Sequence, residues 1–318
     1  MKMRYRILFF PVLLLVAFCM VTQCRSKSVR DILIITDIGT DVDDALAICL
    51  AIEDPQLNIS GIACTGDDVD SKIQIARTLV SQLGHTDIPI GSGASFVDSV
   101  LSHGNGQCDI LLISQATLLS EAIEANYDLV KMIDRIYFQG LATIDSTDGC
   151  KLMPDPAAYN VSEDIYAAQN LFNLQDMIPF TIVGKYSAYP LALSRQVFES
   201  YALSGEPAGV SINQMAIECI ERFAESNPDR FRQVYNISDE VSTKEALDTL
   251  EKISCPYDAV AVLAMTDPDC FTPITYGKHL LIGVLKYDSG IISSKCKFLQ
   301  ERLESLFLSL HAKKITNS

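Results

Sequence analysis

The chain has 318 residues, of which 48% are hydrophobic, so it is long enough to bury the core of one large α/β domain or two smaller ones. Its 40 acidic residues outnumber its 25 basic residues, which gives a formal net charge of −15. Nucleic-acid binding depends on clustered Lys and Arg, so this composition excludes nucleic acid as an expected partner.

The N-terminal residues have the pattern of a targeting segment. Three basic residues within the first six positions precede an apolar run at residues 7–21. This run is shorter than the ~20 residues that span a bilayer as a helix. We therefore expect residues 1–24 to be a signal peptide, with lipid attachment at Cys24 as the alternative and as the only membrane contact. The chain would then be secreted or extracytoplasmic.

After this region, short apolar runs alternate with segments of helical periodicity. Runs typical of strands buried on both faces of a parallel sheet lie at residues 31–36, 57–65, 88–93, 109–114, 135–140 and 180–184. Helical patterns between them lie at residues 43–54, 71–84, 118–134 and 164–172. This order predicts a doubly wound, mostly parallel α/β sheet of the Rossmann type.

The later part of the chain is predicted to be mostly helical. Helical patterns lie at residues 212–225, 243–253, 258–265 and 293–311, and a further strand or hairpin arm lies at 278–288. We find no internal repeat and no Pro/Gly/Ser-rich linker, so residues 25–318 are expected to form a single domain.

Four aspartates lie within eight positions between the first predicted strand and the first predicted helix: Asp37, Asp41, Asp43 and Asp44. Ligands of open α/β sheets bind outside the carboxyl ends of the strands, where this loop lies. Mutual repulsion of the carboxylates is relieved by a hard divalent ion such as Ca²⁺ or Mg²⁺. Turn formation and helix capping would explain only one or two of the four. The loop therefore indicates a metal or substrate site.

Two other acidic motifs do not fit this loop. A haloacid-dehalogenase-type phosphatase requires a second Asp two positions after the first, but Gly39 follows Asp37 at that spacing. An EF-hand loop lies between two helices, whereas a strand precedes this one.

The ten cysteines are compatible with disulfides in an exported protein. However, Cys49, Cys64 and Cys219 lie within apolar segments, where free buried thiols are common. The absence of a CxxC pair argues against a zinc site.

The segment "TDIGTDVDDALAI" resembles the N-terminal signature of the inosine-uridine-preferring nucleoside hydrolases, which are calcium-dependent nucleoside N-ribohydrolases. The resemblance continues at family spacing over nearly the whole mature chain, through "GIACTGDD", "SHGNG", "LLISQATLLSEAI", "YNVSEDIYAAQ" and "YDAVAVLAMTDPDCF". It implies a nucleoside hydrolase-like α/β fold, a small-molecule nucleoside substrate, and hydrolysis of its N-glycosidic bond to ribose and free base.

The resemblance also implies a calcium site. Its ligands would be Asp37, Asp44, Asp258 and the main-chain carbonyl of Gln115, and Asp37 would accept a proton from the attacking water. Independently of the family, several polar residues and one glycine directly follow predicted strands, which gathers them at one edge of a parallel sheet. These are Asp37, Asp67, Gln115, Gly140 and Lys185.

On the substrate side, the resemblance implies that Asp43 and Asn160 bind the ribose. Three positions depart from the family pattern: Asp67 replaces a turn asparagine, Ala158 a glutamate, and Tyr257 a histidine. The metal site therefore looks complete, while the sugar and base contacts are altered.

The leaving base needs assistance in N-glycosidic hydrolysis, and three residues are candidates for it. Tyr257 could donate a hydrogen bond, although a phenol is a weaker acid than imidazolium. His103 lies in a predicted site loop. Lys185 ends a buried strand near Tyr189, and we expect this pair to line the base pocket.

Three functions remain open from the sequence. Calcium-dependent ribonucleoside hydrolysis is favoured by the motifs. The altered positions also fit an exported calcium-dependent protein that binds nucleosides or sugars without hydrolysis, or a hydrolase of another ribosyl substrate. The chain could also form a homo-oligomer.

Overall fold

The computed structural model describes residues 29–104, 106–145, 147, 151–285 and 301. The predicted signal peptide, Cys24 and nearly all of the predicted helix at 293–311 lie outside these residues. In the part of the chain that is described, no helix combines the length and the apolar composition needed to cross a membrane.

The centre of the fold is an eight-stranded sheet with the order β11-β12-β8-β5-β4-β1-β2-β3. Every neighbouring pair is parallel except β11 and β12. The strands are β1 (Arg30–Thr36), β2 (Leu57–Cys64), β3 (Ile90–Ser92), β4 (Cys108–Ile113), β5 (Ile133–Gln139), β8 (Phe180–Val183), β11 (Ile274–Tyr276) and β12 (His279–Ile282). The predicted α/β class with a mostly parallel sheet is confirmed.

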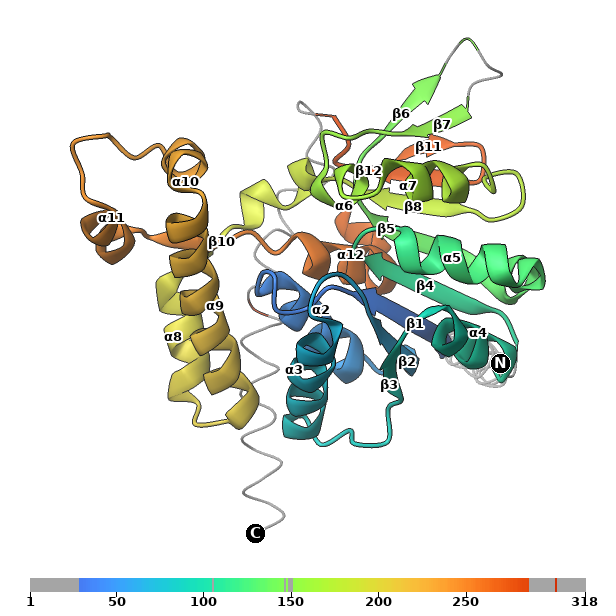
Figure 1. Cartoon of the computed structure of the whole chain (residues 1–318), viewed down its shortest axis with the longest axis horizontal. Coiled ribbons are helices and arrows are strands. Elements are labelled where there is room, and N and C mark those ends of the chain that lie inside the picture. Colours follow the sequence, from blue (N-terminus) through green and yellow to red (C-terminus); the bar gives the residue numbers. More distant parts are fainter. Residues whose placement is uncertain (1–28, 105, 146, 148–150, 286–300, 302–318) are drawn as a thin grey trace, which may run out of the picture.

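Helices cover both faces of this sheet (Figure 1). One face packs against α2 (Asp43–Glu53), α3 (Val69–Gln82) and α12 (Tyr257–Thr266), and the other against α4 (Ala94–Ser102), α5 (Thr117–Ala125) and α7 (Ile165–Phe172). Alternate side chains of β1 enter the two layers: Ile32 and Ile34 join the first core, whereas Leu33 and Ile35 join the second. This double burial explains the continuous apolar run.

A helical segment, residues 195–251, lies to one side of the sheet (left in Figure 1). It contains α8 (Arg195–Leu203), α9 (Pro207–Ser226), α10 (Pro228–Tyr235) and α11 (Thr243–Thr249). A two-stranded ribbon of β9 (Leu193–Ser194) and β10 (Lys252–Ser254) connects both of its ends to the α/β body. Helix α9 also contacts α3, where the Gln82 side chain donates a hydrogen bond to Ser211 at 3.0 Å. The helical character of this region was predicted, but α8 and α10 were not.

Several predicted elements have different boundaries in the structure. The predicted helix at 118–134 ends at Ala125, and the side chain of Asn126 then caps a short 3-10 helix, η1 (Tyr127–Met132). The helix predicted at 243–253 ends at Thr249, because the chain turns into β10. Shorter elements absent from the prediction are β6 (Ala142–Asp145), β7 (Lys151–Pro154), α6 (Tyr159–Ser162), η2 (Lys185–Ser187), η3 (Tyr189–Leu191) and η4 (Pro268–Cys270).

Cys49, Cys64, Cys108 and Cys219 are free thiols. Cys49, Cys64 and Cys219 are buried, in agreement with the expectation from their apolar surroundings. Packing rather than disulfide bonding therefore holds these parts of the core together.

A buried polar network closes the amino-terminal edge of the sheet. The Arg30 guanidinium bonds to Asp109 at 3.1 Å, to the Tyr137 hydroxyl at 3.0 Å and to the main-chain carbonyl of Met265. Asp109 is 3% exposed, and its Oδ1 has no hydrogen-bond partner among the described residues. Burial raises the pKa of Asp109 from 3.8 to about 6, although Arg30 opposes the shift.

The raised pKa of Asp109 predicts a pH-dependent contribution to stability. Its folded pKa lies above its unfolded pKa, so the contribution is present below about pH 4 and is lost as pH rises towards 6. The difference corresponds to roughly 3 kcal/mol. Urea unfolding between pH 4 and 7 should therefore show a steeper loss of stability in the wild type than in Asp109→Asn. Parallel pH profiles of the two proteins would contradict this assignment.

Candidate functional site

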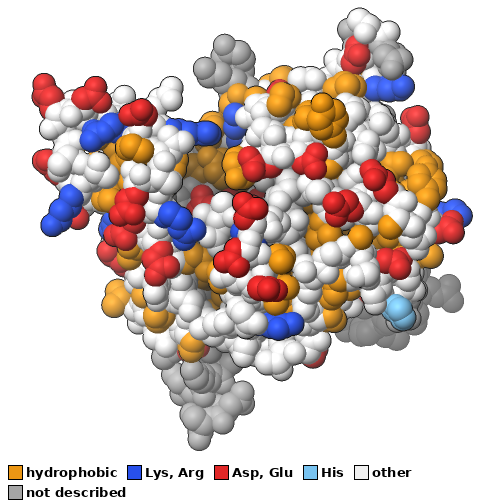
Figure 2. Space-filling view, in the orientation of Figure 1, with side chains coloured by type: hydrophobic (Ala, Val, Ile, Leu, Met, Phe, Trp, Pro, Cys, Tyr) orange, Lys and Arg blue, Asp and Glu red, His pale blue; other side chains and the backbone are white. Residues whose placement is uncertain are grey.

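The site lies where the order of the parallel strands reverses, between β1 and β4. Such a reversal opens a crevice at the carboxyl ends of the strands, which is where α/β sheets bind ligands. Asp37 directly follows β1, and Gln115 lies two residues after β4. The surface is hollowed between the helical segment and the α/β body, and acidic side chains surround this hollow (Figure 2).

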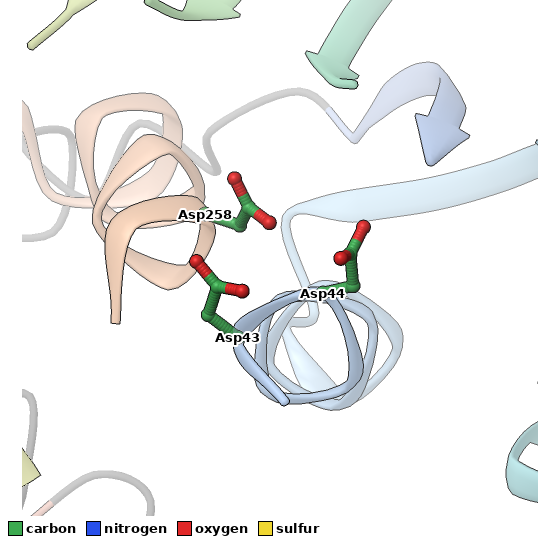
Figure 3. A group of neighbouring side chains, drawn as sticks. All are labelled: Asp43, Asp44 and Asp258. Atoms are coloured by element: carbon green, nitrogen blue, oxygen red, sulfur yellow. The ribbon is translucent and has the colours of Figure 1, made fainter. Parts of the chain in front are cut away.

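Three buried carboxylates form the centre of the site. Asp43 and Asp44 lie in the first turn of α2, and Asp258 lies in the first turn of α12. One oxygen from each lies within 4.8 Å of the others, and their exposures are only 5%, 3% and 4%. The side chains project from the two helices into a common space (Figure 3). Both helix N-termini favour negative charge at this point.

The end of β1 fixes one of these carboxylates. The Thr36 hydroxyl donates a hydrogen bond to Oδ1 of Asp44 and accepts one from the main-chain amide of Ile38 at 3.1 Å. Thr36 and Asp44 are both almost fully buried. Strand β1 and helix α2 therefore hold Asp44 in one position.

The electrostatic environment of this carboxylate triad is unfavourable without a cation. Burial raises the pKa of Asp43, Asp44 and Asp258 well above the usual range, and repulsion between neighbouring carboxylates adds to the effect. Burial also raises the pKa of Asp37 and Asp41. Because five such groups share one crevice, a positive charge at its centre would stabilise them together.

The nearby cations bind neutral oxygens of the aspartate loop rather than the triad. Nζ of Lys72, on α3, donates to the Asp37 carbonyl at 2.7 Å, and Nη1 of Arg222, on α9, donates to the Gly39 carbonyl at 2.8 Å. Within the described ranges, no salt bridge joins Lys or Arg to a triad carboxylate. Three oxygen donors on rigid helices without a paired cation fit a hard divalent ion, so the triad could hold a metal ion.

The structure gathers the predicted aspartates in one place. Asp37 is 8% exposed, and its charge adds to the raised pKa of both Asp44 and Asp258, which places it beside the triad. Asp43, which is expected to bind ribose, lies within the triad itself. The Gln115 side chain packs beside Gly66, 3.3 Å from the point where a Cβ would sit.

The predicted sugar-binding residue Asn160 lies on α6 and is 7% exposed. Its side-chain amide donates to the side-chain oxygen of Gln139 at 2.9 Å and to the Gln139 carbonyl at 3.2 Å. Gln139 is the last residue of β5, so this contact places Asn160 at the carboxyl edge of the sheet.

A second group of polar side chains lies near Asp37. Burial, followed by the charges of Glu163 and Asp37, raises the pKa of Tyr159, and the Glu163 carboxylate also adds to the raised pKa of Asp37. The charge of Asp67, an exposed residue after β2, also raises the pKa of Tyr159. Tyr159 and Glu163 were missed in the sequence because they lie on and directly after α6, a helix of four residues that is too short to show periodicity.

The predicted base-side residues form an aromatic wall, which we define as Tyr186, Tyr189 and Tyr257. The ring centroids of Tyr186 and Tyr189 are 5.8 Å apart, and those of Tyr189 and Tyr257 are 6.2 Å apart, both edge-on. Nζ of Lys185 lies 5.7 Å from the Tyr186 ring and donates to the Ala157 carbonyl at 2.8 Å. Because Tyr257 immediately precedes Asp258, this wall begins next to the triad.

The aromatic wall offers hydrogen bonds rather than protons. Burial, followed by the neighbouring Cys255 thiol, raises the pKa of Tyr257 well above the usual range. The Tyr257 phenol is therefore neutral and a weak acid. It can donate a hydrogen bond to a ligand but would rarely release its proton.

The structure does not bring His103 to the site. Helix α4 starts after the carboxyl end of β3 and runs back towards the amino end of β4, so His103, which directly follows the helix, lies at the opposite edge of the sheet. The ring Nδ1 lies 2.7 Å from the Ser99 carbonyl of the same helix. His103 therefore lies in a turn, as expected, but at the edge of the sheet opposite to the site, because α4, a helix that was not predicted, precedes it.

Comparison with solved structures defines the class of the fold. No protein-family model matches the sequence, and no curated protein matches it. The chain nevertheless has the fold of the nucleoside hydrolases. It superposes on the purine-preferring ribonucleoside hydrolase from Gardnerella vaginalis with a TM-score of 0.63 and 15% identity, covering 87% of this chain and 99% of the other. The superposition on the inosine-uridine preferring nucleoside hydrolase from Bacillus anthracis has a TM-score of 0.56 and 11% identity, and it covers 87% of this chain and 99% of the other.

An effector protein has the same fold. The type III effector protein XopQ, solved in complex with adenosine diphosphate ribose, has a TM-score of 0.75 and 18% identity, covering 93% of this chain and 98% of the other. Identities this low establish the fold and leave the activity to be argued from the site.

The unfavourable electrostatics of the triad lead to a test of metal binding. Asp258→Asn removes one of three repelling carboxylates, so in chelator its melting temperature should exceed that of the wild type by several degrees. Calcium should raise the melting temperature of the wild type and have little effect on the variant. Differential scanning fluorimetry measures both. A variant that is less stable in chelator, or equally stabilised by calcium, would contradict the assignment.

Proposed function

We propose that this protein is a metal-dependent N-ribosyl hydrolase that converts ribonucleosides to ribose and free base. The observation that carries the proposal is the buried carboxylate triad at the strand reversal of a nucleoside hydrolase fold. A glycosidic bond breaks through an oxocarbenium-like state, whose positive charge is stabilised by surrounding carboxylates. The site therefore has the charge that this reaction requires.

We infer that the metal is Ca²⁺. Asp44 and Asp258, with the Gln115 carbonyl and Asp37, offer the oxygen ligands that this ion prefers, and Asp43 is close enough to join them. Bound Ca²⁺ would offset part of the negative charge of these carboxylates and lower the pKa of a bound water. The charge of the triad supports a divalent ion, and the all-oxygen donor set favours Ca²⁺ or Mg²⁺ over softer metals.

The residues of the chain would have separate roles in the reaction. Asp37, partly accessible at the edge of the triad, accepts a proton from the attacking water. Asn160, held by Gln139, and Asp43 orient the ribose hydroxyls. Tyr257 and Tyr189 contact the base, and Tyr257 donates a hydrogen bond to it as the bond breaks.

Binding or cleavage of a different ribosyl compound is the second candidate. The superposition on XopQ, which was solved with adenosine diphosphate ribose, has a higher TM-score than those on the two nucleoside hydrolases. The weak acidity of Tyr257 and the distant position of His103 also favour a ligand whose base needs no protonation, or no cleavage at all.

Export completes the proposal. The signal peptide at residues 1–24 and the alternative anchor at Cys24 rest on the sequence pattern. An exported, calcium-dependent hydrolase would meet its ion at the high concentrations outside the cytosol, which a site of moderate affinity requires. Self-association also remains a prediction.

Release of base and ribose from a panel of purine and pyrimidine nucleosides tests the proposed reaction. The chain from about Ser26 should cleave at least one of them with calcium and none with chelator. Asp37→Asn should lower kcat by at least 100-fold, because it removes the proton acceptor. Asp128→Asn, a surface control in an exposed ion pair, should be unchanged. Calorimetric binding of nucleosides or adenosine diphosphate ribose without product would support the second candidate instead.

Stacking on the aromatic wall is tested with Tyr189, which is 46% exposed. Tyr189→Leu should raise KM roughly tenfold for the preferred nucleoside, because base stacking contributes about 1–3 kcal/mol. Tyr189→Phe retains the ring and should remain near the wild type. Lys185→Ala should change affinity or turnover if this residue also lines the base pocket. Unchanged kinetics in Tyr189→Leu and Lys185→Ala would place the base elsewhere.

A further inference from the structure

Three consecutive main-chain carbonyls of the aspartate loop are bound by cationic side chains. The Lys72 ammonium contacts the Asp37 carbonyl at 2.7 Å and the Ile38 carbonyl at 3.4 Å, and the Arg222 guanidinium contacts the Gly39 carbonyl at 2.8 Å. Hydrogen bonds from charged donors are stronger than those from neutral donors. The two cations therefore fix the path of the chain between β1 and α2.

The conformation of this loop is one that few residues could adopt. Gly39 has a φ of +94°, and a Cβ at this position would lie 2.8 Å from Cδ1 of Ile75. A glycine is flexible by itself, so such a turn needs external contacts to remain in one conformation. The bond from Arg222 to Gly39 is such a contact.

Arg222 comes from a different part of the fold than Lys72. Lys72 lies on α3, in the α/β body, whereas Arg222 lies on α9 of the helical segment. The end of the same segment passes through β10 into α12, which carries Asp258 in its first turn. The helical segment thus contacts the site twice: through Arg222 at the loop before Asp43, and through the connection to Asp258.

We propose that Arg222 is a positioning residue that couples the helical segment to the metal-binding loop and thereby sets the metal affinity of the triad. The inference rests on the proposed metal site. Its physical basis is preorganisation: a loop already held in its bound conformation loses less freedom when the ion binds. The carboxylates at both ends of the loop then keep the spacing that the ion needs.

The charge of Arg222 and its contact with the loop predict opposite effects on metal affinity when Arg222 is replaced. A guanidinium near the carboxylates repels a divalent ion, and Arg222 does act to lower the pKa of Asp41. If this repulsion dominated, Arg222→Gln would bind the ion more tightly. If positioning dominates, the same variant binds it more weakly, so the sign of the change separates the two roles.

Calcium affinity measured by titration calorimetry provides the first test. Arg222→Gln should bind calcium about tenfold more weakly than the wild type, because it loses a charged hydrogen bond to the loop. Arg222→Lys should recover part of the loss. The matched control is Arg232→Gln, since Arg232 on α10 donates to the Ser238 carbonyl at the same 2.8 Å but lies away from the loop. It should stay within twofold of the wild type.

Hydrogen exchange in chelator provides a second test that does not depend on the metal. Peptides covering residues 37–44 should exchange several-fold faster in Arg222→Gln than in the wild type and Arg232→Gln. Unchanged exchange, or tighter calcium binding by Arg222→Gln, would overturn the positioning role. If the wild type binds no calcium but the loop exchanges faster in Arg222→Gln, the positioning role holds and the proposed metal function is the part that fails.

Discussion

The burial of several carboxylates in one crevice is the constraint around which this fold is organised. Each carboxylate loses hydration and repels its neighbours, as the raised pKa values of Asp43, Asp44 and Asp258 reflect. The surrounding structure compensates in part. Two helix N-termini point their positive ends at the site, and the Thr36 hydroxyl binds Asp44. The remaining negative charge has no paired cation among the described residues, and buried unpaired charges destabilise a fold. This cost points to a cation that binds at the site.

The two cationic side chains near the triad, Lys72 and Arg222, also leave its carboxylates unpaired. Lys72 and Arg222 could each have formed an ion pair with an aspartate, yet both donate hydrogen bonds to main-chain carbonyls of the loop. A lysine inside the triad would occupy the position of an ion and neutralise the site permanently. Cations at the periphery instead stabilise the loop and leave the centre of negative charge available. The arrangement could therefore accommodate an exchangeable positive charge, such as the metal ion or the oxocarbenium centre of the proposed reaction.

The sequence was most informative where chemistry and local structure coincide. An unbroken apolar strand followed by four aspartates predicted both β1 and the site, because parallel strands place the residues after them at one edge. Lys185 and Gln115 were located by the same rule. His103 was misplaced because only two of the nine residues of α4 are buried, so the helix carries little periodic signal. Lys72 and Arg222 could not have been identified, since their role depends on how α3 and α9 pack against a loop distant in sequence.

The distribution of titratable groups limits how the proposed reaction can proceed. Of the described histidines, His103 directly follows α4 at the amino edge of the sheet, and His279 at the start of β12 accepts a hydrogen bond from the main-chain amide of Phe180 there. His85 follows the C-terminal end of α3, which also lies at the amino edge of the sheet, away from the site. In the proposed reaction, the site would combine a proton acceptor in Asp37 with the neutral Tyr257 phenol on the base side. Most of the barrier must then be lowered by activation of water and stabilisation of the ribosyl cation, rather than by protonation of the base. Such a site would discriminate among substrates more by the leaving-group ability of the base than by the shape of the base.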